Sequence, residues 1–142
     1  MNLQWLQMRI NEEQERRQRE DNIRNRLPSA LQELHASLTE CLDSYTEAFG
    51  ARAATIQFGS GRVRIEIRDQ AETKWVPRAE ILIANDLTIP GFRIERAGEP
   101  YLVHVGVLAG DKLFYQDGED YITIEELTRR ILDRALFPKL AE

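Results

Sequence analysis

His104 is the residue of this chain best suited to acid–base chemistry, because the pKa of a histidine side chain lies near neutrality. It stands within Tyr101–Leu108, an otherwise apolar stretch. General base catalysis requires a substrate pocket and often an orienting partner. Glu80 or Glu95 could supply that partner from a neighbouring strand, but the pairing of strands does not follow from the pattern. We therefore interpret His104 first as a structural or surface residue, and as part of a ligand pocket in the alternative.

The other thiol and imidazole side chains form no pattern typical of nucleophilic or metal chemistry. Cys41 neighbours Leu42 on a predicted helix without a cationic cluster, so we expect it to pack as a small apolar residue. His35 follows Leu34 and is expected at the boundary of the same helix. One cysteine excludes an intramolecular disulfide, and two histidines with scattered carboxylates lack the ligand spacing of a metal centre. We predict no catalytic residue, no metal and no cofactor.

Two features could suggest phosphate or nucleic-acid binding. Gly59-Ser60-Gly61 lacks the spacing of a phosphate-binding loop and is typical of a hairpin turn. Arg62, Arg64 and Arg68 share one face of a predicted strand, where Glu66 and other carboxylates would pair with them. The chain has 24 Asp+Glu against 19 Lys+Arg, a net charge of −5. We therefore favour a solvated face of mixed charge over a nucleic-acid contact, and binding of a nucleic acid or an acidic partner through the three arginines stays a third hypothesis.

Helices are predicted on both sides of Pro28. Residues 3–26 carry many opposite charges four positions apart, which is typical of a solvated helix. Pro28 predicts a break at Arg26-Leu27, since proline disfavours helix in the residue before it. A second helix is expected over 28–49. Its core-facing stripe comprises Leu31, Leu34, Leu38, Leu42, Tyr45 and Phe49.

The rest of the chain predicts an antiparallel sheet and a C-terminal helix. Alternating or apolar runs are separated by turns too short for parallel crossovers. Residues 69–78 are expected to form a polar connection, where Pro77 argues against a central strand. Thr123 is expected to cap a final helix that Pro138 ends. The predicted fold is therefore α+β: two N-terminal helices, a mostly antiparallel meander of about six strands, and a C-terminal helix packed on it. A single domain over 28–142 would carry a protruding charged helix, 1–27. The six predicted strands are 54–58, 62–68, 79–84, 92–96, 101–108 and 113–116.

Apolar residues outside the expected core indicate a contact surface. Part of the predicted sheet has apolar residues on both faces, so its second face requires cover. The first helix also begins with an apolar tip, which a charged middle separates from the core. Tryptophan is enriched among residues that dominate interface energetics. The residues that we expect at the contact surface are Trp5, Leu6, Ile10, Leu82, Leu102 and Leu108.

Interaction rather than catalysis is the function that these observations favour. We expect a non-enzymatic protein-interaction or scaffold protein, which self-associates through the N-terminal helix, the second sheet face or both, or which binds another protein. The alternative is a small-molecule-binding domain or small enzyme with a pocket between sheet and helix. That pocket would be lined by His104, Tyr101, Tyr115 and Trp75.

The composition also bears on location. The chain contains no apolar run of about 18 residues, which predicts no transmembrane helix and no membrane partner. Its start, Met1–Arg9, lacks the basic segment followed by an apolar stretch of a secretory signal. A single thiol suits a reducing compartment. Together these features favour a cytoplasmic location.

Overall fold

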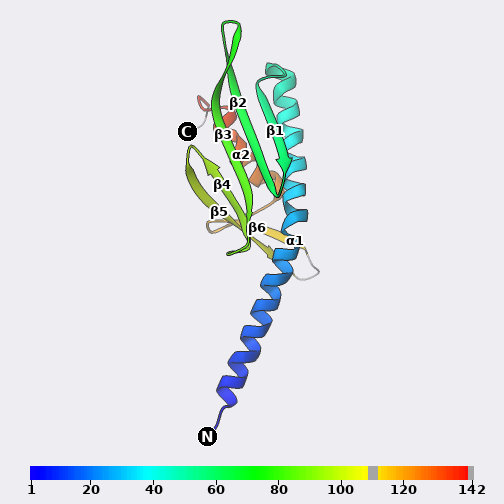
Figure 1. Ribbon diagram of the computed structural model, residues 1–142, viewed down its shortest axis with the longest axis vertical. Helices are drawn as coiled ribbons and strands as arrows, with labels where there is room; N and C mark the ends of the chain where they lie inside the picture. The colour runs from blue at the N-terminus through cyan, green and yellow to red at the C-terminus, as the bar shows by residue number, and fades with distance from the viewer. Residues whose placement is uncertain (109–111, 141–142) are drawn as a thin grey trace.

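The computed structural model describes residues 1–108 and 112–140, and within them the protein is α+β. Two helices, α1 (Gln4–Phe49) and α2 (Ile124–Leu136), accompany one seven-stranded antiparallel sheet. The strands are neighbours in chain order from β1 to β7, so the sheet is the predicted meander. α1 extends far beyond the sheet at its N-terminal end (Figure 1).

α1 is one continuous helix of 46 residues, so the prediction of two helices with a break at Arg26-Leu27 is wrong. Pro28 lies inside it. A proline in a helix interior removes one backbone donor and bends the helix, and the two halves of the α1 ribbon differ in direction (Figure 1). The helix continues because tertiary packing outweighs the local cost: Leu27 and Leu31, on either side of the proline, are fully buried.

The sheet has one strand more than the predicted six, because the last strand is too short to show alternation. β3 also begins earlier than Pro77 suggested. Pro77 pairs with Arg68 next to a β-bulge in β3, where Arg78 is the extra residue, while β4 reaches only Ile81 on the other side. The proline therefore lies where β3 has a single neighbouring strand, a position that tolerates it. The strands are β1 (Ala54–Gly59), β2 (Arg62–Ala71), β3 (Lys74–Asp86), β4 (Gly91–Arg96), β5 (Glu99–Val107), β6 (Leu113–Asp117) and β7 (Asp120–Ile122).

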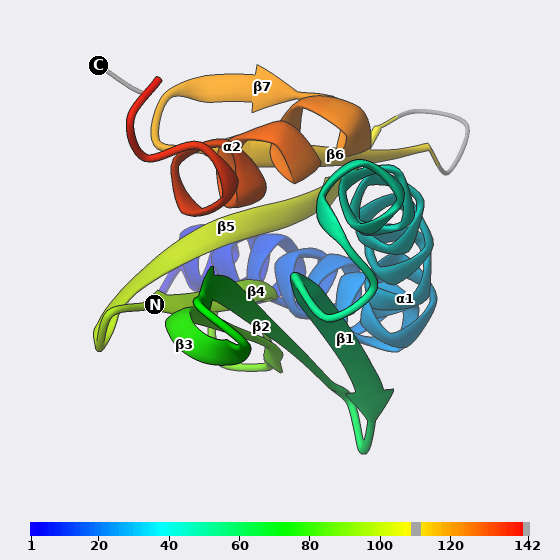
Figure 2. The same cartoon turned by 90° about the horizontal axis from the view of Figure 1, so that it is seen from above.

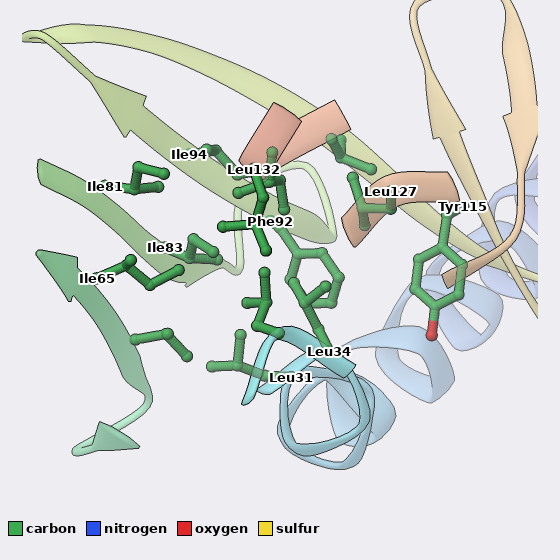
Figure 3. Close-up of a cluster of buried hydrophobic side chains, with 14 of the residues drawn as sticks. Leu31, Leu34, Ile65, Ile81, Ile83, Phe92, Ile94, Tyr115, Leu127 and Leu132 are labelled. Carbon is green, nitrogen blue, oxygen red and sulfur yellow. The ribbon is translucent and has the colours of Figure 1, made fainter. Parts of the chain in front are cut away.

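The core lies between the inner face of the sheet and both helices. Val63, Ile65 and Ile67 are fully buried on β2, and charged residues alternate with them on the outer face. α1 contributes Leu34 and α2 contributes Leu127 to the same buried cluster. Figure 3 shows side chains of the strands and of both helices gathered in this cluster, and Figure 2 shows the curved sheet with the two helices.

α2 begins as predicted. The Thr123 side chain accepts a hydrogen bond from the backbone N–H of Glu126 at 3.1 Å, which satisfies one of the free donors of the first turn. The helix buries Leu127 and Ile131 against the core. A hydrogen bond of 2.7 Å from the hydroxyl of Thr128 to that of Ser37 joins α2 to α1.

Candidate functional site

Two of the four residues predicted to line a pocket, Tyr101 and Tyr115, belong to the inner side of the sheet. Tyr115 is buried and stacks on Phe92, with ring centroids 6.0 Å apart. Burial raises the pKa of Tyr115 to about 12, and the charge of Glu33 adds to this effect. Burial also raises the pKa of Tyr101. Both phenols are therefore neutral packing groups at physiological pH.

The other two predicted pocket residues lie elsewhere. His104 is exposed on the outer face of β5, between the buried Val103 and Val105. Trp75 lies at the beginning of β3, where its ring packs so close to Gly50 that a Cβ there would be 3.2 Å away. The structure therefore does not bring His104, Trp75 and the two tyrosines together around one space.

The outer face of the sheet carries the predicted leucines among charged residues. Leu82 pairs with Arg64 on one side and Glu95 on the other, and Leu102 pairs with Arg93. β4 therefore places charged side chains between the two leucines, which are 39% and 40% exposed. Leu108 lies just beyond the end of β5 and is 53% exposed. The three leucines thus do not share one continuous apolar area.

Two of the three arginines predicted on this face, Arg64 and Arg68, have carboxylate partners. Arg64 and Glu80 form an ion pair of 2.6 Å across β2 and β3. Arg68 pairs with Glu66 at 3.2 Å on the same strand. These arrangements agree with a solvated face of mixed charge.

The N-terminal end of α1 presents a group of exposed apolar side chains. We call residues 3–10 the tip. Trp5 is 65% exposed, and Leu6 and Ile10 are 38% and 41% exposed. At 3.6 residues per turn, Leu6 and Ile10 lie on one side of the helix and Trp5 on a different side. The exposed apolar residues of the tip are Leu3, Trp5, Leu6, Met8 and Ile10.

A charged segment, residues 11–22, connects the tip to the rest of the protein, and we call it the stalk. It contains no apolar residue. Ion pairs along the helix surface support it: Glu13 with Arg16 at 2.6 Å, Glu20 with Arg24 at 3.2 Å, and Arg16 with Glu20. Arg24 Nε also donates to the carbonyl of Leu87 at 2.6 Å, which ties the base of the stalk to the loop after β3. The stalk thus holds the tip roughly 20 Å away from the core.

A groove of about 580 Å³ separates α1 from α2 at the opposite end of α1. The sequence predicts Phe49 as part of the core stripe. The end of α1 extends beyond the elements that pack against the helix, however, and Phe49 is 58% exposed. Tyr45 lies 4.9 Å from Phe49 and 5.7 Å from Phe137 between ring centroids. Burial, followed by the charge of Glu40, raises the pKa of the Cys41 thiol in this groove. The sequence does not indicate this groove, because the residue pattern does not show where the sheet stops covering α1. Its lining includes Cys41, Ser44, Tyr45, Phe49, Leu132 and Phe137.

Comparison with known proteins adds no assignment. No family model, curated protein or solved structure matches the chain. Among the described residues, no helix is long and apolar enough to cross a membrane, and no three His, Cys, Asp or Glu side chains are placed to hold a metal ion. The tip, the stalk and the groove are therefore the features that bear on function.

Proposed function

We propose that this protein is a non-enzymatic interaction module that self-associates through the N-terminal part of α1. The observation that carries this proposal is the tip, where five apolar side chains surround an exposed helix over about two turns. A helix that is apolar on several sides is typically buried. Among residues 1–108 and 112–140, nothing outside α1 covers the tip, because the stalk holds it away from the core.

The charged stalk supports the same proposal. Helices without tertiary contacts are marginal in water, and pairs of opposite charge three or four residues apart stabilise them. The stalk carries such pairs along its length, including Arg17 with Glu13 at 3.7 Å and Arg24 with Asp21 at 3.2 Å. A helix kept in this way presents the tip in a defined direction, which lowers the entropy lost on binding.

The small-molecule alternative receives less support. Its four residues are distributed over both faces and two ends of the sheet, so they do not line one space. The outer sheet face is also the weaker of the two contact surfaces, because ion pairs surround Leu82 and Leu102. The tip is therefore the part of the molecule on which self-association is best tested.

The test is sedimentation of the full chain over a wide concentration range, with Trp5→Glu compared with Gln7→Glu. Both changes add one negative charge to the tip, but Gln7 lies on its polar side, where it donates to Asn11 at 3.1 Å. A buried tryptophan at an interface typically contributes about 2 kcal/mol or more, so Trp5→Glu is expected to weaken association by about 30-fold. Gln7→Glu is expected to have much less effect. A wild-type chain that stays monomeric at the highest concentration would refute the proposal.

A further inference from the structure

The two halves of α1 carry complementary stripes of charge. On the second half, Glu33, Glu40, Asp43 and Glu47 are the only charged residues between Pro28 and Gly50. Their spacing of seven, three and four places them on one side of the helix, and all four are exposed. No lysine or arginine occurs in this half of α1, although Arg129 of α2 lines the same groove as Glu40.

The first half carries mostly positive charges on the C-terminal side of Trp5. Steps of four, three, four and three lead from Trp5 through Arg9, Glu12 and Arg16 to Arg19, so these residues share one side of the helix. Three of the four charged residues on this stripe are arginines. The ion pairs that Arg9 and Arg16 make with carboxylates of their own helix are exposed, and exposed pairs exchange partners at small cost.

The tip and the groove lie at opposite ends of the same helix, because Cys41, Tyr45 and Phe49 of the groove belong to its last turns. Figure 1 shows how far apart the two ends of α1 are. Leu6 and Tyr45 are 39 positions apart, about 58 Å along a continuous helix. A straight helical segment cannot fold back on itself, so the tip cannot reach the groove of its own chain. It can reach the same groove on a second copy.

We propose that two copies exchange their N-terminal segments, with the two α1 helices antiparallel and the tip of each copy at the α1–α2 groove of the other. This inference rests on the proposed self-association and names its surface. In this direction two arginines meet carboxylates: when Trp5 is level with Glu47, Arg9 is level with Asp43 and Arg19 with Glu33. Glu12, which pairs with Arg9 of its own helix at 2.9 Å, is level with Glu40, and Arg16 is level with Ala36. The Leu6 side of the tip then covers the exposed aromatic groove around Phe49.

The area available favours this arrangement over contact between two tips alone. A stable interface typically buries about 800 Å² on each partner, whereas a two-turn helix is only about 12 Å long. Antiparallel exchange extends the contact along both stalks and fills two grooves. It is also isologous, since the same two surfaces meet twice, and so it closes as a dimer.

Crosslinking at Cys41 tests the arrangement, because this thiol lies in the groove. We would place a second cysteine by Ile10→Cys in the full chain and react the dimer with a short bismaleimide in mildly alkaline buffer, since the pKa of Cys41 is raised. The expected product is a dimer in which mass spectrometry identifies a link between position 10 and Cys41. The control is Thr55→Cys, which adds an exposed thiol on β1 and is expected to give no such link.

The outcomes separate this inference from the proposed function. A link only between two copies of position 10, unchanged in the Cys41→Ser background, would show that the tips meet each other; self-association would stand and groove docking would be overturned. A chain that neither crosslinks nor sediments as an oligomer would refute both.

Charge reversal provides a second measurement that does not depend on thiols. Asp43→Arg is expected to weaken association about tenfold, and adding Arg9→Glu is expected to recover most of that loss. Glu99→Arg, which makes the same change of charge at an exposed position of β5, is the matched control. Equal weakening by Asp43→Arg and Glu99→Arg, without recovery by Arg9→Glu, would overturn the antiparallel placement.

Discussion

The two halves of α1 have the same secondary structure and different reasons for it. In the second half, Leu31, Leu34 and Leu38 are fully buried against the sheet and α2. In the first half, residues 1–22 contribute no buried side chain, and ion pairs along the helix surface take the place of packing. One half of the helix is therefore part of the core, and the other half is kept helical without it.

Helical structure and tertiary stability are therefore separate properties of α1. Most helical stability in proteins comes from the packing of an apolar face. The first half has apolar side chains only at the tip, where they do not contact the core. Substitutions in the two halves should thus differ sharply in their effect on the free energy of unfolding.

The largest effect is expected for Leu34→Ala. It removes a fully buried side chain from the core and should lower the free energy of unfolding by about 2–5 kcal/mol. Met8→Ala removes a side chain of similar size from the tip and should leave it unchanged in dilute, dissociated protein. Denaturant unfolding followed by far-UV circular dichroism measures both. Equal losses would mean that the first half of α1 belongs to the cooperative core.

A pH effect is expected from Tyr115, which lies in the body of the protein. Its pKa is about 12 in the folded state against 10 as the ordinary value, so above pH 10 the unfolded chain releases a proton that the folded protein retains. Stability should therefore fall between pH 10 and pH 12. Tyr115→Phe should flatten this part of the stability curve. A curve for Tyr115→Phe as steep as that of the wild type would contradict the assignment.

Loss of a helix cap typically costs about 1 kcal/mol of stability, and its effect should differ between α2 and the tip. Thr123→Ala removes the side-chain acceptor at the start of α2 and should destabilise the whole body by that amount. Asn2→Ala removes the bond from the backbone N–H of Gln4 to the Asn2 side chain, 2.9 Å long. It should fray only the tip, as amide exchange would report. Global destabilisation by Asn2→Ala would mean that the tip unfolds together with the core.

The smallest effect is expected for Glu20→Gln, which removes the ion pairs with Arg16 and Arg24. Helicity of the stalk should decrease slightly at low salt and by less at high salt, because exposed pairs are screened. Glu99→Gln is a matched change on β5 that should not affect stalk helicity. Amide exchange at residues 11–22 measures both. A loss that does not depend on salt would mean that Glu20 supports the stalk by packing.

Local patterns predicted much of the fold correctly. The alternation over Arg62–Arg68 and the cap at Thr123 both correspond to structure, because each depends on residues close together in the chain. The break before Pro28 failed because burial of Leu27 and Leu31 offset a cost that is visible locally. Pro77 is tolerated in β3 for a different reason, because β4 does not reach it and only β2 pairs with the strand there.

The candidate site shows the same limit. Trp5, Leu6 and Ile10 were predicted for contact from their position before a charged segment, and they are exposed in the structure. The grouping of His104 with Tyr101 failed because residues of odd and even number lie on opposite faces of a strand. Phe49 was placed in the core because its spacing continues the leucine stripe.

The alternation of the strands, the apolar and charged stripes of α1 and the apolar tip all follow from residue type and spacing along the chain. Where those stripes are left uncovered follows from packing between distant segments. Whether a side chain is buried depends on what packs against it, so the exposed end of α1 beside α2 became visible only once the sheet and both helices were in place.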